Sequence, residues 1–157
     1  MTLRLAVPSR PTTPSSGGAP STANVVQSEF AEFVGGGAIF AATIDVADST
    51  FTNNRIVDTN TALFDSRTQV GGDGGGAIIG YYVDVRDSTF SNNAATTRWW
   101  NDGGAIAVYQ GGEFLSHLTV VRSTFADNTA TGQEGAIFAR TADVMLVESA
   151  LVRNTAY

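Results

Sequence analysis

Short segments in which hydrophobic and polar residues alternate recur along the chain from about residue 24 onwards. In Ile44-Asp45-Val46, for example, a period of two places both aliphatic side chains on one face and the aspartate on the other, as in a half-buried β-strand. The segments 83–85, 118–120 and 144–146 present a similar apolar face. Because these segments are short, are bounded by Gly and Asn and show no apolar stripe of helical period, the pattern predicts strands throughout.

The predicted strands belong to an internal repeat made of two motifs. The first motif is Gly-Gly-Ala-Ile, with Glu in place of the first Gly in the fourth copy, and it occupies residues 36–39, 75–78, 103–106 and 134–137. The second motif is Ser-Thr-Phe-x-x-Asn, degenerate in the fourth copy, and it occupies residues 49–54, 88–93, 123–128 and 149–154. Repeats of this length indicate a solenoid, in which each unit buries its apolar face against its neighbours.

Stacking the copies produces columns of chemically similar residues. The columns are Ile39, Ile78, Ile106 and Ile137; Phe51, Phe90, Phe125 and Leu151; and Asn54, Asn93, Asn128 and Asn154. In stacked parallel coils each residue lies about 4.8 Å from its equivalent, so aliphatic and aromatic side chains fill the core while amides bond along a ladder. We therefore predict an all-β fold, a right-handed parallel β-helix (solenoid) of about four to five coils.

The same pattern predicts which side chains point inward. After a bend near Asp48 we expect Ser49 and Phe51 to face the core and Thr50 to face outward. The ladder asparagines also tolerate the left-handed backbone that sharp corners require. We expect Ile39 to point inward, and the residues that follow each motif isoleucine to face outward or to lie under a loop: Phe40, Ile79, Ala107 and Phe138.

The repeat also defines the domains. Residues 1–23 are rich in Pro, Ser, Thr and Gly and are predicted to form a flexible linker, whereas residues 24–157 form the β-helix domain. Variable spacing between copies places insertions at about Arg55–Asp73, Ala94–Asp102 and Gln110–Ser116. The chain stops where another Gly-Gly-Ala-Ile motif is expected, so we expect a fragment of a longer array.

Composition and charge narrow the functional classes. The 9 basic and 15 acidic residues give a net charge of −6, which argues against a nucleic-acid partner because phosphate binding needs clustered positive charge. The absence of Cys excludes disulfides and thiolate metal sites. Arg4 and Pro8 break the first apolar run, so we see no signal peptide, and no stretch is long enough for a membrane-spanning helix.

Gly-Gly-Ala-Ile followed by Phe-x-x-Asn resembles the repeat of polymorphic outer membrane proteins, over roughly residues 35–157. The resemblance implies a right-handed β-helix of the pectate-lyase-like superfamily, and an autotransporter-like passenger that is extracellular or associated with the outer membrane. It also implies an adhesin-like or structural role, with a glycan or a host or cell-surface protein as partner. Four paired motifs are specific for this architecture and are not specific for an activity.

Stacked carboxylates are the first candidate chemistry. Asp45 lies beside Asp84 in the predicted stack, and such a pair on an outer face would suit Ca²⁺ or acid/base catalysis with Arg86 nearby, as in a polysaccharide lyase. The alternative is a solvated, partly ion-paired face, because charged residues belong outside in any case. The row of carboxylates ends at the third copy, where Thr119 replaces Asp, and this favours the alternative.

Adjacent indoles are the second candidate. Trp99 and Trp100 stand in a predicted loop, where they would either bind a sugar ring or a partner protein or cover the edge of a coil. His117 is the only histidine, and no triad partner is visible in the sequence, so we interpret it as structural. The leading hypothesis is a non-enzymatic surface segment without catalytic residue, metal ligand or resident cofactor. The alternative is a carbohydrate-active enzyme, a lyase or hydrolase of pectate-lyase-like fold.

Overall fold

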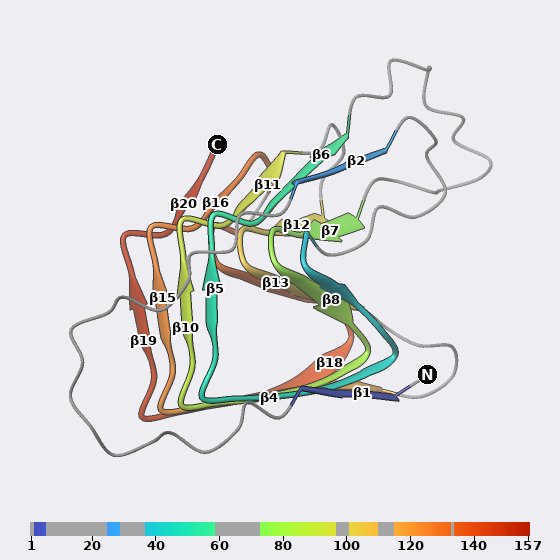
Figure 1. The fold of residues 1–157 in the computed structure, drawn as a ribbon, viewed down its shortest axis with the longest axis vertical. Coiled ribbons are helices and arrows are strands. Elements are labelled where there is room, and N and C mark those ends of the chain that lie inside the picture. The colour runs from blue at the N-terminus through green and yellow to red at the C-terminus, as the bar shows by residue number, and fades with distance from the viewer. Residues whose placement is uncertain are drawn as a thin grey trace.

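The computed structural model of the protein describes residues 2–5, 25–28, 37–58, 73–96, 101–109, 115–132 and 134–157. Within these residues the structure is all-β, and the strands pair in parallel with strands from other copies of the repeat. The prediction of a parallel β-helix is therefore confirmed. Figure 1 shows successive coils lying side by side with the same outline.

Each coil passes through four sheets in a fixed order, which we number I to IV (Figure 1). Sheet I contains β3 (Ile39–Phe40), β8 (Ile78–Gly80), β13 (Ile106–Val108) and β17 (Ile137–Ala139). Sheet II contains β1 (Thr2–Leu5), β4 (Thr43–Ala47), β9 (Tyr82–Arg86), β14 (Ser116–Val121) and β18 (Ala142–Val147).

Sheet III contains β5 (Thr50–Thr52), β10 (Thr89–Ser91), β15 (Thr124–Ala126) and β19 (Ala150–Val152). Sheet IV contains β2 (Val25–Ser28), β6 (Arg55–Asp58), β11 (Ala94–Thr96), β16 (Thr129–Ala130) and β20 (Thr155–Ala156). A further pair, β7 (Asp73–Gly75) and β12 (Asn101–Gly103), precedes sheet I in coils 2 and 3. Coils 1 to 4 are the strand sets β3–β6, β8–β11, β13–β16 and β17–β20.

Stacked side chains of like shape form the core. The rings of Phe51, Phe90 and Phe125 lie nearly parallel, with centroids 4.8 and 4.7 Å apart, and Leu151 follows Phe125 in the register. Aliphatic residues of sheets I and II surround this stack. The strand spacing thus sets the ring spacing, and identical residues fit because each coil offers the same cavity to the next.

A ladder of buried asparagines joins the coils between sheets III and IV. The backbone N–H of Asn54 donates to Oδ1 of Asn93 at 3.0 Å, and that of Asn93 donates to Oδ1 of Asn128 at 3.0 Å. Nδ2 of Asn93 donates to the carbonyl oxygen of Phe51, also at 3.0 Å. At each step the side chain of the later coil therefore satisfies backbone groups of the earlier coil.

Corners of the coil use the left-handed backbone, at residues adjacent to the ladders. Between sheets II and III the residues with positive φ are Asp48, Asp87, Arg122 and Glu148, and between sheets III and IV they are Asn53, Asn92, Asp127 and Arg153. The expected bend at Asp48 is confirmed. The ladder asparagines do not have this conformation, so that expectation was wrong: their amides bond the neighbouring coil, and the preceding residue makes the turn.

Sheet IV was not predicted. Two of the predicted insertions begin too early, because Arg55–Asp58 and Ala94–Thr96 form strands of this sheet. Its inward residues are the small cluster of Ile56, Ala95 and Ala130. Strands of two to four residues with such small apolar side chains show no readable alternation.

Two further predictions can be compared with the described residues. In sheet I, Ile79, Ala107 and Phe138 are buried in a second cluster, whereas Phe40 is exposed. Within segment 1–23, predicted to be a linker, the structure describes only Thr2–Leu5, which pairs in parallel with β4. The rest of that segment lies outside the described residues.

Candidate functional site

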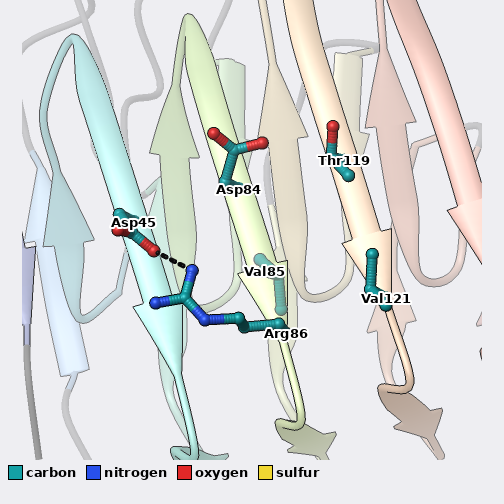
Figure 2. A pocket seen from close by; sticks show the side chains of 6 residues that line it. All are labelled: Asp45, Asp84, Val85, Arg86, Thr119 and Val121. Atoms are coloured by element: carbon teal, nitrogen blue, oxygen red, sulfur yellow. Dashed lines mark hydrogen bonds and ion pairs between the residues drawn. The ribbon is translucent and has the colours of Figure 1, made fainter.

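The outer face of sheet II brings the predicted carboxylates together. The register places Asp45 of β4 beside Asp84 of β9, then Thr119 of β14 and Met145 of β18. Alternation makes this row point outward, since the residues on either side of it in β4, β9 and β14 are buried. Asp45, Asp84, Arg86 and Thr119 contribute to a shallow depression of about 190 Å³ on this face (Figure 2).

An ion pair spans the depression. Arg86 reaches from β9 across to β4, where its Nη1 lies 2.8 Å from Oδ1 of Asp45 (Figure 2). Both side chains remain partly exposed, so the pair contributes little to stability. The pair matters more for the chemistry of the depression. A guanidinium that is bound to a carboxylate is not available as a base or as a binding group for an anion.

His117 has partners that sequence reasoning missed. Its Nε2 lies 3.1 Å from Oδ1 of Asp84 and 2.7 Å from Oγ1 of Thr119. A catalytic triad needs the hydroxyl and the carboxylate on opposite ring nitrogens, whereas here both lie on the same nitrogen. The three side chains therefore form a polar cluster without triad geometry. The signal in the sequence was the strand register, which pairs His117 with the residue two positions before Asp84.

Two corner ion pairs have two hydrogen bonds each. Arg122 binds both carboxylate oxygens of Asp87 at 2.7 Å, and Arg153 binds those of Asp127 in the same way. The hydrogen bonds from these guanidinium groups hold the pKa of each carboxyl below its usual value and raise the pKa of each arginine. In both pairs the arginine belongs to the later coil, so these contacts also join successive coils.

Glu134 is the residue that replaces Gly in the fourth copy of the first motif. It forms a parallel bridge to Gly103 of the preceding coil. Its Oε2 is buried and has no hydrogen-bond partner within the part of the chain that the structure describes. Burial therefore raises the pKa of this carboxyl, because desolvation disfavours the charged form.

The other candidates from the sequence are a metal site and a pair of ligand-binding indoles. In the described ranges no three His, Cys, Asp or Glu side chains converge on a point that would hold a metal ion, and the Asp45–Asp84 pair that would suit Ca²⁺ already contacts Arg86 and His117. Trp99 and Trp100 lie outside the described residues. No helix among the described residues is long and apolar enough to cross a membrane.

Comparisons with known proteins found no similar protein. No family model matches the chain, and neither the curated proteins nor the solved structures contain a match.

Proposed function

We propose that this chain is a non-enzymatic repeat segment of a secreted or cell-surface β-helix protein, with an adhesin-like or structural role. One observation carries the proposal: the repeated polar residues are used to join the coils. The Asn ladder and the corner ion pairs of Asp87 and Asp127 all run from one coil to the next. Such side chains stabilise the stack of coils, so contacts with other molecules are left to the outward faces of the stack.

The resemblance to polymorphic outer membrane protein repeats supports a location outside the cell or at the outer membrane. The outer face of sheet II is the proposed contact surface, since it presents Tyr82, Asp84 and His117 side by side on β9 and β14. A carboxylate and an imidazole bond sugar hydroxyls or polar protein groups, and the tyrosine adds apolar area. A glycan or a cell-surface protein is therefore the proposed partner.

Glycan-array binding and binding to intact cells test this surface. Asp84→Asn removes the charge and is expected to weaken binding about tenfold, the effect of losing one charge-assisted hydrogen bond. Asp48→Asn is the matched control, because it removes a carboxylate at the corner between sheets II and III, outside the depression and outside the row of Tyr82 and His117, and asparagine also tolerates the left-handed backbone of Asp48. This variant should bind like the wild type. Equal losses in both variants, or no binding to any glycan or cell, would contradict the adhesin-like role.

A carbohydrate-active enzyme is the second candidate, and the depression holding Asp45, Asp84 and Arg86 is the observation that favours it. The ion pair of Arg86 with Asp45 and the end of the acidic row at Thr119 argue against it. Incubation with polyuronates, with and without Ca²⁺, distinguishes the two. Product release that disappears in Asp84→Asn would replace the non-enzymatic proposal with the enzymatic one.

A further inference from the structure

The depression on sheet II contains one carboxylate without a permanently charged partner. Nη1 of Arg86 lies 2.8 Å from Oδ1 of Asp45, so this guanidinium is bound to the carboxylate of β4. The carboxylate of Asp84, one strand further, is exposed, and its Oδ1 lies 3.1 Å from Nε2 of His117. No described residue bonds its Oδ2. One oxygen of Asp84 is therefore open to a ligand in the depression.

The arrangement of charges in the depression disfavours anionic ligands. Figure 2 shows the guanidinium of Arg86 turned towards Asp45, whereas the carboxylate of Asp84 stands apart from it. Arg86 is the only cationic side chain among the described residues that line the depression, against the two carboxylates of Asp45 and Asp84. A uronate or a sulfated sugar would bring a like charge towards Asp84, and like charges across an interface oppose binding. A ligand with a positive group is favoured instead.

The hydrogen-bonding groups beside Asp84 suit a ligand that carries a hydroxyl group next to its charge. Oγ1 of Thr119 lies 2.7 Å from Nε2 of His117, so a carboxylate, an imidazole and a hydroxyl group meet at one place. Tyr82 pairs with His117 in the register and is 37% exposed, so its ring offers apolar area to a sugar ring. An amino sugar has an ammonium group, a hydroxyl group on the adjacent carbon and an apolar ring face, and it therefore matches all four side chains.

A basic polypeptide matches the charge of the depression but fewer of its polar groups. A lysine ammonium group would pair with Asp84 as an amino sugar does. The lysine side chain has no hydroxyl group, however, so the imidazole of His117 and the hydroxyl of Thr119 would be left to water. The polar groups around Asp84 therefore favour the amino sugar.

The charge of the wider face favours an oligomer over a single sugar. Asp143 of β18 pairs with His117 in the register and is exposed. The outward side chains of β4, β9, β14 and β18 thus include three carboxylates and one guanidinium among the described residues. An oligomer with an amine on every ring can contact more than one of these carboxylates, and such linked contacts raise the overall affinity.

We propose that the outer face of sheet II, taken as the contact surface of the proposed function on which this assignment rests, binds oligomers of an amino sugar whose amine is free. The ammonium group donates to Oδ2 of Asp84. The adjacent sugar hydroxyl bonds His117 or Thr119, and the ring of Tyr82 packs against the apolar face of the sugar. Uronates and sulfated sugars are not ligands of this surface.

Short glucosamine oligomers and their N-acetylated forms of equal length are the probes, because they differ only in the charge of the amine. At about pH 7 such an amine is protonated in a large fraction of molecules, as a peptide α-amino group is. In titration calorimetry the full chain should bind the free-amine oligomer at least about tenfold more tightly, the effect of one charge-assisted hydrogen bond. Asp84→Asn should reduce this preference to less than about threefold, whereas Asp48→Asn should retain it.

Equal affinities of the wild type for the two oligomers would overturn the amino-sugar assignment and leave the adhesin-like role standing. The same holds if neither oligomer binds while another glycan or a cell does. Lack of binding to any glycan or cell would contradict the proposed function as well. An oligolysine with the same number of amines should bind at least about tenfold more weakly than the glucosamine oligomer, and equal or tighter binding would identify a basic polypeptide as the partner instead.

Arg86→Gln tests the assignment in the opposite direction. The substitution removes the positive charge from the depression and leaves both carboxylates in place. The free-amine oligomer should therefore bind about two- to fivefold more tightly, as expected for one exposed charge interaction. Unchanged or weaker binding by a variant whose circular dichroism matches the wild type would overturn the assignment.

Discussion

The buried asparagines of the ladder join each coil to the next through their side-chain amides. A buried asparagine is costly unless its donors and acceptors are satisfied. Asn128 meets this condition: its Oδ1 accepts from the N–H and Nδ2 of Asn93, and its Nδ2 donates to the carbonyl of Phe90. Each such residue therefore completes three bonds between coils that an aliphatic side chain of similar size could not make.

Replacing Asn128 by alanine should lower the free energy of unfolding by about 2–4 kcal/mol, since it leaves buried donors of Asn93 and the Phe90 carbonyl without partners. Urea-induced unfolding measures the change. Thr124→Ala, on the exposed face of the adjacent strand β15, serves as the control and should stay within about 0.5 kcal/mol of wild type. A similar small effect for Asn128→Ala would show that the amide ladder does not stabilise the fold.

The corner ion pairs should give the fold an acid-sensitive component. Hydrogen bonds from Arg122 and Arg153 lower the pKa of Asp87 and Asp127. The folded state therefore binds protons at these two carboxylates less readily than the unfolded chain does. The ion pairs consequently stabilise the folded state at pH values above the unfolded aspartate pKa of about 3.9. This stabilisation is lost as the pH falls through the lower folded pKa values.

Chemical unfolding between pH 7 and pH 2 tests that dependence. The wild type should lose stability below about pH 4 more steeply than the double variant Asp87→Asn/Asp127→Asn. The difference is small because both carboxylates are exposed to solvent. Arg122→Gln/Arg153→Gln should reproduce the shallower profile, and a wild-type profile in either double variant would contradict the assignment.

At the scale of elements, the turns before sheet I limit which residues fit. A Cβ on Gly37, Gly76 or Gly104 would lie 2.0–2.1 Å from the carbonyl oxygen of the equivalent glycine in the next coil. That contact is with backbone, which cannot rotate away. The glycines of the first motif are therefore required by the close approach of one coil to the next, and the strands of sheet I begin directly after them.

Gly104→Ala should prevent folding or lower stability by more than about 3 kcal/mol, because the added methyl group meets backbone of coil 4. Thermal unfolding followed by circular dichroism measures it. Gly80→Ala offers a graded comparison, since its Cβ would lie 2.9–3.0 Å from side-chain carbons of Val83 and Ile44 and 3.0 Å from the carbonyl oxygen of Ala41. These contacts are about 1 Å longer than the backbone contact at Gly104, so the substitution should cost less. Equal effects of the two substitutions would contradict the backbone-clash explanation.

At the scale of the whole molecule, stability should vary along the stack. Each coil contacts only its neighbours, as in other solenoids. Coils 2 and 3 have a neighbour on both sides, whereas the apolar residues of β18 and β19 are exposed. In a polypeptide of residues 1–157 the cost of opening should therefore be lowest at coil 4 and highest in the middle of the stack.

Native-state hydrogen exchange tests this gradient. Amides of Val83 and Leu118 should exchange slowest, and those of Val144 and Leu151 should exchange faster by at least about tenfold. The Thr124→Ala variant should leave the gradient unchanged, because its side chain faces solvent. A single common exchange rate for all four coils would show instead that the described stack opens as one unit.

Sequence alone predicted three of the four sides of the coil. Alternation around Ile44 and the repeated Ser-Thr-Phe motif defined strands and their register, since a column of like residues fits only one alignment of the copies. Sheet IV was missed because the inward residues Ile56, Ala95 and Ala130 are few and small. The Asp45–Asp84 pair followed from the register, whereas the contacts of His117 depend on side-chain direction within one face.

The repeat by itself determined the parallel stack, because identical residues at identical positions satisfy one another only when the coils lie in register. Only the tertiary structure decided how the polar side chains are used. It placed Arg86 on Asp45, put two partners on one nitrogen of His117, and supplied the arginine of both corner ion pairs from the later coil. These features depend on which neighbour a flexible side chain can reach on the adjacent strand, about 4.8 Å away. The order of residues along the chain does not specify that choice.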